Sequence, residues 1–380
     1  MKTKGMWVWL VIFLFLGGLV GLAQAKVRGQ CSNCHTMHNS QGGSPMTFDN
    51  STTPNRTLLR AANCLGCHSD SAPSGVQAVT PIVKHSSDPG YVFGSTRGST
   101  LAGGDFYYVT LSDAKVHNVD ELGNNDDVLN APPGYVYNGD YGRGNGTWPS
   151  GRAVSCAGTY GCHGDPSKED PFASIAGAHH ANINRTGTGN ATTVATSYRF
   201  LLGIYGTEDP DWEGGTLDTS HHNGYYAVDR STVNSYTAPD KHTINYLCGE
   251  CHGNFHAQID YDSTVGSPWI RHPTDYDMNN VKTKEYGNYP NTALFSGKYG
   301  VSAAGDYFVD VPVGNNQGAV KSQVLQASGD AIVLCVSCHK AHGSPYDDLL
   351  RWDYSACQAG TGNATSAANC GCFACHTTKY

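Results

Sequence analysis

Five copies of one short motif, Cys-x-x-Cys-His, constrain this chain more than any other feature of its sequence. They are Cys31/Cys34/His35, Cys64/Cys67/His68, Cys248/Cys251/His252, Cys335/Cys338/His339 and Cys372/Cys375/His376. The composition of the chain would give only about 0.02 such motifs by chance, and the spacing is that of c-type haem attachment. Two thiols add to the vinyl groups on one porphyrin edge, and the next residue places an imidazole under the iron. Structural zinc is disfavoured, because it needs four ligands assembled from paired motifs, whereas each pair here has its own histidine.

A sixth group has the same order of residues but a wider spacing. Cys156 is followed after five intervening residues by Cys162 and His163. A longer loop between the thiols can bulge outward while Cys162 and His163 keep their usual positions. The group also fills the long gap between the second and third motifs. The alternative is a Cys156–Cys162 disulfide beside an unrelated histidine, which an oxidising compartment would allow. We therefore predict six haem c groups, five from the standard motif and one from this group.

Two cysteines remain, Cys357 and Cys370, on either side of a polar loop just before the last motif. In an exported chain a disulfide between them is the simplest interpretation. Closing a loop of this length would stabilise the folded chain by roughly 3 kcal/mol. The alternative is that one of the two replaces Cys372 as the thioether partner of Cys375.

Histidine is the expected ligand on the second side of each iron. The chain has 17 His and only five Met, so bis-histidine ligation is predicted throughout. Three histidines follow a proximal one too closely to reach the far face of the same haem, so each should bind a different haem and bring the porphyrins together. The distal candidates are His38, His117, His179, His180, His256, His272 and His342, of which His38, His256 and His342 are these three. His85, His221, His222 and His242 are weaker candidates, because a lone histidine is more often a surface or hydrogen-bonded residue.

The first 25 residues have the pattern of a cleaved signal peptide. Lys2 and Lys4 precede an apolar run, residues 6–22, which ends in the small-x-small sequence Ala23-Gln24-Ala25. The alternative is a retained membrane anchor, since the run is close to the roughly 18 residues that span a bilayer. A lipid anchor is disfavoured because Lys26, not a cysteine, follows the predicted cleavage site. We expect an exported protein without a membrane anchor.

Charge and composition limit the partners and the fold. The formal charge is −8 and no cluster of Lys and Arg is present, so nucleic acid is not an expected partner. We predict one domain over residues 26–380, mostly irregular coil with short α-helices and few short strands, organised around a stacked haem chain that serves as the core. Helices are expected over 57–68 and 172–184 and at each haem motif, and strands over 106–111 and 307–313. No internal sequence repeat is apparent.

The residues that flank the motifs carry a resemblance. The opening Cys-Ser-Asn-Cys-His-Thr-Met-His, the Lys-Val-His-Asn-Val block around His117, the Trp-Ile-Arg-His-Pro block around His272, and the blocks that end at His256 and His342 resemble the extracellular cytochrome filaments of metal-reducing bacteria, the OmcS and OmcE type. The resemblance implies six haems and assembly into a homopolymer. It also implies that His38 leaves its own subunit and binds the haem at Cys335/Cys338/His339 of a neighbour. The wide spacing of Cys156 and Cys162 departs from that family.

These features predict an electron-transfer protein without a catalytic residue. In the leading hypothesis six bis-histidine haems form a chain that continues from subunit to subunit and carries respiratory electrons to extracellular acceptors such as metal oxides, with other cytochromes as further partners. A monomeric periplasmic electron shuttle is the alternative. A multihaem reductase is a third possibility, which would need one haem with an open coordination position.

Overall fold

The computed structural model describes residues 27, 29–123, 129–137, 141–144, 146–180, 192–230, 240–256 and 272–380. The predicted signal peptide, residues 1–25, lies outside these ranges. Most of the described chain is turn, bend or coil, which confirms the predicted irregular fold. Many of the 46 glycines adopt a positive φ, which only glycine adopts without strain, so the chain turns too often for long helices or strands. None of the described helices has the length and apolar character needed to span a membrane.

The α-helices are one or two turns long. They are α2 (Cys31–Cys34), α3 (Ser74–Gln77), α4 (Pro171–Ser174), α5 (Ile244–Gly249), α6 (Gly253–His256), α7 (Thr292–Phe295), α8 (Cys335–Cys338), α9 (Ala364–Ala367) and α10 (Cys372–Cys375). Three of them, α2, α8 and α10, are haem motifs, so the predicted link between motif and helical turn holds for these.

Four two-stranded ladders contain the strands. The strands are β1 (Ser40–Gln41), β2 (Ser44–Pro45), β3 (Ser155–Ala157), β4 (Gly161–His163), β5 (Gly206–Thr207), β6 (Gly224–Tyr225), β7 (Val313–Gly314) and β8 (Ile332–Val333). The pairs β1–β2, β5–β6 and β7–β8 are antiparallel, and β3–β4 is parallel, with Ala157 opposite His163. The parallel pair holds the two cysteines of the widely spaced group.

Four of the expected elements differ from the structure. Residues 106–111 are not a strand: they form the 3₁₀ helix Phe106–Thr110, because the Asp105 carboxylate accepts a hydrogen bond from the backbone N–H of Tyr107. The region 57–68 has only the short 3₁₀ turns Arg56–Leu58 and Cys64–Gly66. In the region 172–184, α4 is followed by the 3₁₀ helix Ala178–His180, and the remainder lies outside the described residues. Only Val313 of the region 307–313 is in a strand.

An apolar core lies in the C-terminal third of the molecule. It includes Tyr289, Phe295, Phe308 and Trp352, each at most 2% exposed. Smaller clusters surround Ile332 and Phe106. The haems were expected to serve as the core of the whole domain, but this part of the chain buries enough apolar side chains to have a conventional one.

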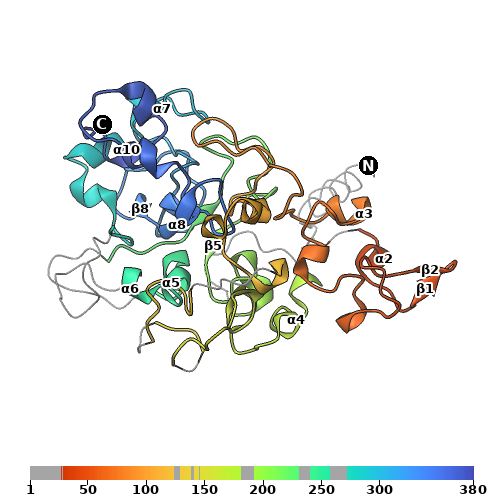
Figure 1. The fold of residues 1–380 in the computed structure, drawn as a ribbon. Coiled ribbons are helices and arrows are strands. Elements are labelled where there is room, and N and C mark those ends of the chain that lie inside the picture. The colour runs from red at the N-terminus through yellow and green to blue at the C-terminus, as the bar shows by residue number, and fades with distance from the viewer. Residues whose placement is uncertain are drawn as a thin grey trace, which may run out of the picture.

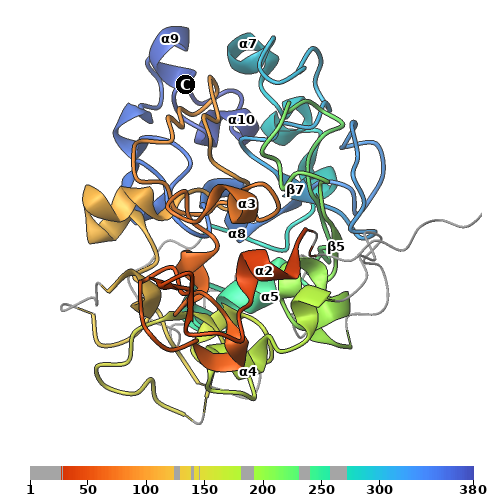
Figure 2. The same ribbon diagram turned by 90° about the vertical axis from the view of Figure 1, so that its right-hand side faces the viewer.

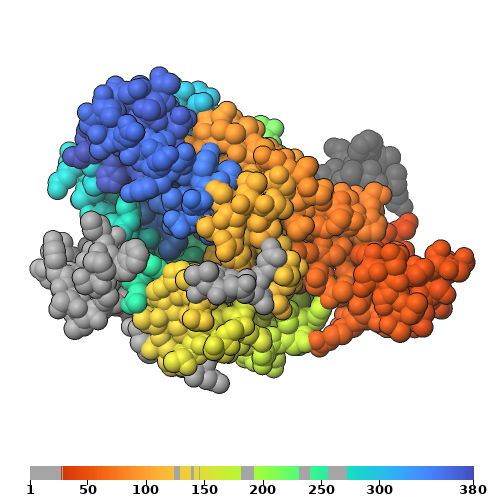
Figure 3. All heavy atoms as spheres, viewed as in Figure 1, coloured from red at the N-terminus to blue at the C-terminus, as the bar shows by residue number. Residues whose placement is uncertain are grey.

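The N-terminal segment projects from the rest of the molecule. Figure 1 shows α2, β1 and β2 at one end and α7, α8 and α10 at the other. We call residues 29–60 the N-terminal arm. In Figure 2 the arm faces the viewer, with the C-terminal helices behind and above it. In the space-filling view of Figure 3 the arm forms a lobe of its own.

Candidate haem-binding sites

Six cysteine–histidine sites are numbered 1 to 6 in chain order. Their proximal histidines are His35, His68, His163, His252, His339 and His376. In five sites the motif forms a single helical turn, closed by a hydrogen bond of 2.8–3.0 Å from the backbone N–H of the histidine to the carbonyl of the first cysteine. Residues three apart on such a turn lie on one face, so both thiols point the same way. Site 3 is the exception.

Five of the six proximal imidazoles face a second imidazole. The ring centroids are 6.0 Å apart for His35–His180, 6.3 Å for His68–His179, 6.4 Å for His163–His342, 6.2 Å for His252–His117 and 6.1 Å for His376–His272. Two imidazoles bound on opposite sides of one metal ion, each at about 2.0 Å, have centroids roughly 6 Å apart. The spacing fits bis-histidine ligation at each of these sites. All five partners are among the predicted distal candidates.

Hydrogen bonds identify the ring nitrogen that remains free for a metal. Nδ1 of His68, His163, His252 and His339 lies 2.8–3.0 Å from a backbone carbonyl oxygen. A carbonyl oxygen only accepts, so Nδ1 carries the proton and Nε2 is the available ligand atom.

Burial keeps the imidazoles neutral. It lowers the pKa of His252 to about 4 and that of His342 to about 3, with smaller contributions from neighbouring cationic groups. Burial also lowers the pKa of His68, His117 and His163. Neutral imidazole is the form that binds a metal ion, so these rings need not lose a proton before binding at pH 7.

Adjacent sites share the segments that supply their distal imidazoles. The consecutive residues His179 and His180 face sites 2 and 1 respectively. The N–H of His117, which faces site 4, donates to the carbonyl of His342, which faces site 3, at 3.1 Å. The distal residues therefore connect site 1 to site 2 and site 3 to site 4.

Site 5 differs from the other sites. His339 is exposed, and no described histidine lies against its ring as in the five pairs. Two distal candidates, His38 and His256, remain without a pair. The side chain of His256 lies outside the described residues. His38 is exposed on the N-terminal arm beside Met37, which is 79% exposed. Figure 1 shows α8, which carries the site 5 cysteines, well apart from α2 and β1, the two elements on either side of His38 in the chain.

The four weaker candidates make other contacts. His85 is hydrogen-bonded to Asp105 and His221 to Asp218. His222 stacks on Tyr307 with centroids 3.5 Å apart, and both of its ring nitrogens lie near backbone carbonyl oxygens. His242 stacks on Tyr205 at 4.2 Å. None of the four faces a proximal imidazole of sites 1 to 6.

Site 3 has its cysteines on strands instead of a helical turn. Cys156 lies on β3 and Cys162 on β4, and both are free thiols and not a disulfide. The Glu121 carboxylate holds this strand by accepting hydrogen bonds from the Cys156 N–H, at 3.1 and 3.2 Å, and from the Ser155 hydroxyl, at 3.0 Å. Gly161 permits the close strand approach, because a Cβ there would lie 2.6 Å from the Ala157 backbone.

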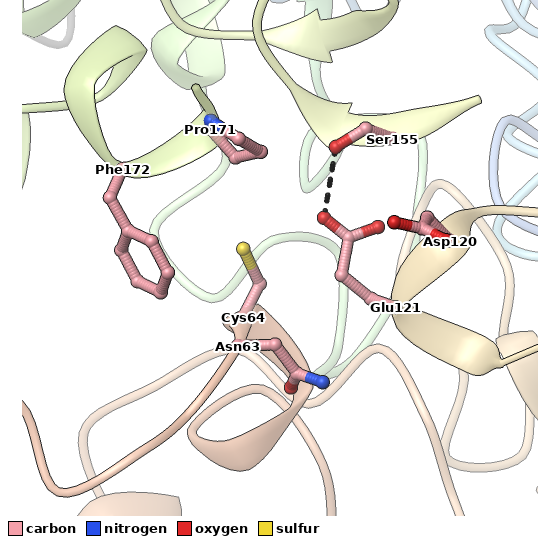
Figure 4. Close-up of a pocket in the computed structure, with 7 residues that line it drawn as sticks. All are labelled: Asn63, Cys64, Asp120, Glu121, Ser155, Pro171 and Phe172. Atoms are coloured by element: carbon pink, nitrogen blue, oxygen red, sulfur yellow. Dashed lines mark hydrogen bonds between the residues drawn. The ribbon is translucent and has the colours of Figure 1, made fainter. Parts of the chain in front are cut away.

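A small pocket lies between sites 2 and 3. Figure 4 shows Cys64 and Glu121 lining it from neighbouring segments, with Phe172 on the far side of Cys64 and the Glu121 carboxylate bonded to Ser155. The Cys64 thiol, the Cys156 thiol and a Glu121 oxygen all lie within 4.8 Å of one another. Attachment atoms of the two sites are therefore neighbours.

Contacts between thiols place the sites in one series. The Cys34 and Cys67 thiols contact one another, as do those of Cys64 and Cys156 and those of Cys248 and Cys335. Burial and then the nearby Cys162 thiol raise the pKa of Cys251 to about 12, and burial and then Cys372 raise that of Cys338 to about 12. The sites thus follow one another in space in the order 1 to 6.

A recurrent loop supports sites 1, 3 and 5. We call these three segments the clamp loops; they are residues 56–60, 198–202 and 347–351. Each contains two successive residues with positive φ, and the carbonyl of the second accepts a hydrogen bond of 2.7–2.8 Å from the residue after the proximal histidine. The positive-φ pairs are Thr57 and Leu58, Arg199 and Phe200, and Asp348 and Leu349. In each loop the second positive-φ residue is a large apolar residue followed by Leu: Leu58-Leu59, Phe200-Leu201 and Leu349-Leu350. This two-residue pattern is too short to be apparent as a repeat in the sequence.

Site 6 is held by a carboxylate. His376 Nδ1 lies 3.1 Å from Glu285 Oε1. Burial alone would raise the pKa of Glu285, but hydrogen bonds from Thr378 and His376 outweigh burial, and the pKa is lowered. Next to this site, Cys357 and Cys370 form a disulfide, the pairing that the sequence predicts. Cys357 Sγ lies 3.8 Å from Cys372 Sγ. No sequence motif marks Glu285 or Glu121, so sequence reasoning missed both.

Buried donors also fit a prosthetic group with carboxylates. Arg97 Nε and Nη1, Arg143 Nε and Nη1, and Arg351 Nη1 are buried with no hydrogen-bond partner in the described structure. Buried guanidinium groups ordinarily pair with acceptors. The two propionates of a haem would supply such acceptors, so the donor set and the imidazole spacing both fit haem c.

Comparisons with known proteins agree with this chemistry. The family described as the doubled CXXCH motif matches residues 326–380. Over 372 residues the chain is 24% identical to the C-type cytochrome OmcS of Geobacter sulfurreducens, an alignment that covers 85% of this chain and 78% of the relative. This similarity confirms the resemblance predicted from the flanking blocks and supports haem c as the cofactor.

Two solved structures are also similar. The Outer Membrane Cytochrome S filament from Geobacter sulfurreducens is 19% identical, with a TM-score of 0.41, over 88% of this chain and 86% of the other. The OmcS nanowires of the same organism, solved by cryo-electron microscopy, are 18% identical with a TM-score of 0.40, over 93% and 94% of the two chains.

Proposed function

We propose that this protein is an extracellular electron-transfer cytochrome that binds six haem c groups and polymerises into a conductive filament. The filament would pass respiratory electrons to external acceptors such as metal oxides, and other cytochromes would be its partners. When bound, each haem supplies a one-electron ferric/ferrous couple. The observation that carries the proposal is the continuous series of six sites, five of which have facing imidazoles at 6.0–6.4 Å.

The side chains of this protein would hold the series closed to substrates. The facing imidazoles at sites 1–4 and 6 would both hold the bound group, which would leave no open position for catalysis at these sites. Backbone carbonyls fix the orientation of four proximal rings, and rigid positioning limits the reorganisation that each change of charge requires. We therefore assign no catalytic residue.

Attachment at site 3 is part of the proposal. The covalent attachment residues would be Cys156 and Cys162, with His163 as proximal ligand and His342 as distal ligand. Support comes from the free thiols and from the contact between Cys156 and Cys64, which resembles the contact between Cys248 and Cys335 in sites 4 and 5. Residues 26–380 would fold as one hexahaem domain after removal of residues 1–25, without a membrane anchor.

Assembly would complete site 5. His339 has no described imidazole against it within its own chain, and the exposed His38 belongs to the N-terminal arm, which lies apart from α8. An arrangement in which the His38 of one copy binds at the His339 site of the next satisfies both residues. It also makes a heterologous contact that does not close on itself, which is the geometry of a filament.

Changing His38 to Ala tests the assembly. The variant should keep six covalent haems but lose polymer in electron micrographs of material sheared from the cell surface, and site 5 should become high-spin in the ferric spectrum. His221→Ala is the matched control, because His221 is also exposed but is paired with Asp218. Filaments that persist in His38→Ala would refute the inter-subunit contact.

The same site supports a second candidate function. In a monomer, site 5 would have one imidazole and one open position, as a multihaem reductase requires. Binding of carbon monoxide to the assembled ferrous wild-type protein would favour this candidate. A wild-type protein that stays monomeric would favour a periplasmic shuttle. Absence of binding in the polymer and its appearance in His38→Ala would favour the filament.

A further inference from the structure

Three successive residues, 376–378, hold one glutamate, two through its carboxylate and one through its backbone carbonyl. His376 Nδ1 lies 3.1 Å from Glu285 Oε1, the Thr377 hydroxyl donates to the Glu285 carbonyl at 2.7 Å, and the Thr378 hydroxyl donates to Glu285 Oε2 at 2.8 Å. Glu285 begins the 3₁₀ helix Glu285–Asn288, and its side chain is 12% exposed. The carboxylate is therefore fixed against the back of the proximal imidazole of site 6.

Four of the other five proximal imidazoles have neutral acceptors. Nδ1 of His68, His163, His252 and His339 faces the carbonyl of Pro81, Arg199, Pro133 and Asp348, respectively. A carbonyl is sufficient to fix the tautomer and the orientation of a ligand ring. The negative charge at Glu285 is thus not needed for positioning alone, and it distinguishes site 6 from these four sites.

Nearby positive charge does not cancel that of Glu285. Lys379 Nζ lies 4.0 Å from Glu285 Oε2, and the Lys379 side chain is 61% exposed, so solvent screens this pair. The Tyr286 and His376 rings pack edge to face, with centroids 5.3 Å apart at 71°. The charge of Glu285 therefore acts mainly on the imidazole.

Two other histidine–carboxylate pairs lie outside the six sites. His85–Asp105 and His221–Asp218 have comparable Nδ1–oxygen distances, 2.6 and 2.9 Å, but neither histidine faces another imidazole. Neither would hold a haem in the series of six sites. Only at site 6 does the described chain combine a carboxylate on Nδ1 with a facing imidazole, that of His272.

We propose that Glu285 is a positioning residue that lowers the reduction potential of the haem at site 6. This inference rests on the proposed function. A carboxylate that accepts the Nδ1 proton of an axial imidazole makes the ring a stronger donor to the metal and favours the more positively charged ferric state. With a neutral acceptor in its place, the same haem would be reduced more easily.

The location of site 6 gives this difference a role. Site 6 ends the series in each chain, and site 1, on the N-terminal arm, begins it (Figure 1). In a polymer joined through the arm, an electron that leaves one copy for the next must pass a terminal haem. Glu285 would make that haem the less favourable place for an electron to stay, so electrons would spend little time at the subunit boundary.

The test replaces the charge and keeps the shape. Glu285→Gln, made in the full-length haem-loaded protein, leaves an amide oxygen that can still accept from His376. In a spectroelectrochemical titration, one haem of six should become easier to reduce, with a ferrous-to-ferric ratio about tenfold higher at a fixed potential, equivalent to about 59 mV for one electron. One low-spin signal in the electron paramagnetic resonance spectrum should change, and five should not.

Two further variants separate charge from disturbance. Asp218→Asn removes the carboxylate of a histidine pair outside the series and should leave all six couples unchanged. Thr378→Val keeps the Glu285 charge and removes one of its anchors, so its effect should be smaller than that of Glu285→Gln. Equal shifts in the two site 6 variants, or six unchanged couples in Glu285→Gln, would overturn the inference.

The haem content distinguishes this failure from failure of the proposed function. Mass spectrometry of the C-terminal peptide of the wild-type protein reports whether haem is attached at Cys372 and Cys375. A peptide without haem would contradict the proposed function itself. A peptide with haem, together with unchanged potentials in Glu285→Gln, would contradict only the role of Glu285.

Discussion

At the scale of single residues, the acceptor behind each histidine matters as much as the histidine. Carbonyl groups at four proximal rings and a carboxylate at the fifth fix the proton on Nδ1 and leave Nε2 for a metal. Burial lowers the pKa of several of these rings, so they are neutral over the physiological range. The residues that supply the acceptors belong to no sequence motif.

The widely spaced cysteines of site 3 lead to a prediction about haem content. Because Cys156 and Cys162 are free and lie beside an imidazole pair, the intact mass of the mature protein should correspond to six covalent haems. A double Cys357→Ser/Cys370→Ser variant should keep six, since those residues form the disulfide. A mass that corresponds to five haems would show that Cys156 and Cys162 do not attach one.

At the scale of elements, the clamp loops show how irregular backbone can position a ligand. Each uses two residues with positive φ to direct a carbonyl toward the residue after a proximal histidine. Non-glycine residues in this conformation cost about 1–2 kcal/mol each. The loops of sites 1, 3 and 5 have the same backbone hydrogen bond, so the same strain recurs at alternate sites.

A substitution in the first clamp loop tests this strain. Leu58 is 48% exposed with φ 59°, and a β-branched side chain is especially unfavourable there. Leu58→Ile should lower the free energy of unfolding by about 1 kcal/mol. Thermal denaturation followed by circular dichroism measures the change. Leu111→Ile is the control, because Leu111 is 57% exposed with φ −96° and should change stability by less than about 0.5 kcal/mol. Equal losses in the two variants would contradict the role of the clamp conformation.

At the scale of the whole molecule, the apolar core and the series of sites are unevenly distributed. The largest apolar cluster consists of Phe93 and residues of the C-terminal third, among them Phe308 and Trp352. None of the apolar side chains described in the N-terminal arm is buried, and the nearest buried apolar residues, Ala61 and Leu65, lie beyond its end. The arm is therefore expected to depend on its haem sites for stability more than the C-terminal third does.

Hydrogen exchange measures this difference. In the haem-loaded protein, amides of residues 289–334 should exchange much more slowly than those of the N-terminal arm, because regions with few buried apolar contacts open locally at low cost. Assembly should then slow exchange in the arm more than anywhere else. Equal protection of both regions in the monomeric His38→Ala variant would contradict the uneven core.

The sequence predicted the general character of the fold, mostly coil with short helices and strands, and the histidines that the structure brings together in pairs. The attachment cysteines and proximal histidines were predicted from covalent chemistry, which sets the spacing within a few residues. Five of the seven distal candidates face a proximal imidazole in the structure. The pairing of particular histidines was not predictable, because it depends on contacts between segments far apart in the chain. The strand expected at 106–111 failed because one side chain, Asp105, favours a 3₁₀ turn.

The adjacent residues His179 and His180 have a mechanical consequence. They face sites 2 and 1, so the link between these two sites includes a single peptide bond. If a filament joined through His38 is pulled along its length, the load enters each copy through the N-terminal arm and reaches site 1 first. A covalent tether at that point resists stretching far better than packed side chains do, so the gap between the first two sites should keep its width under tension.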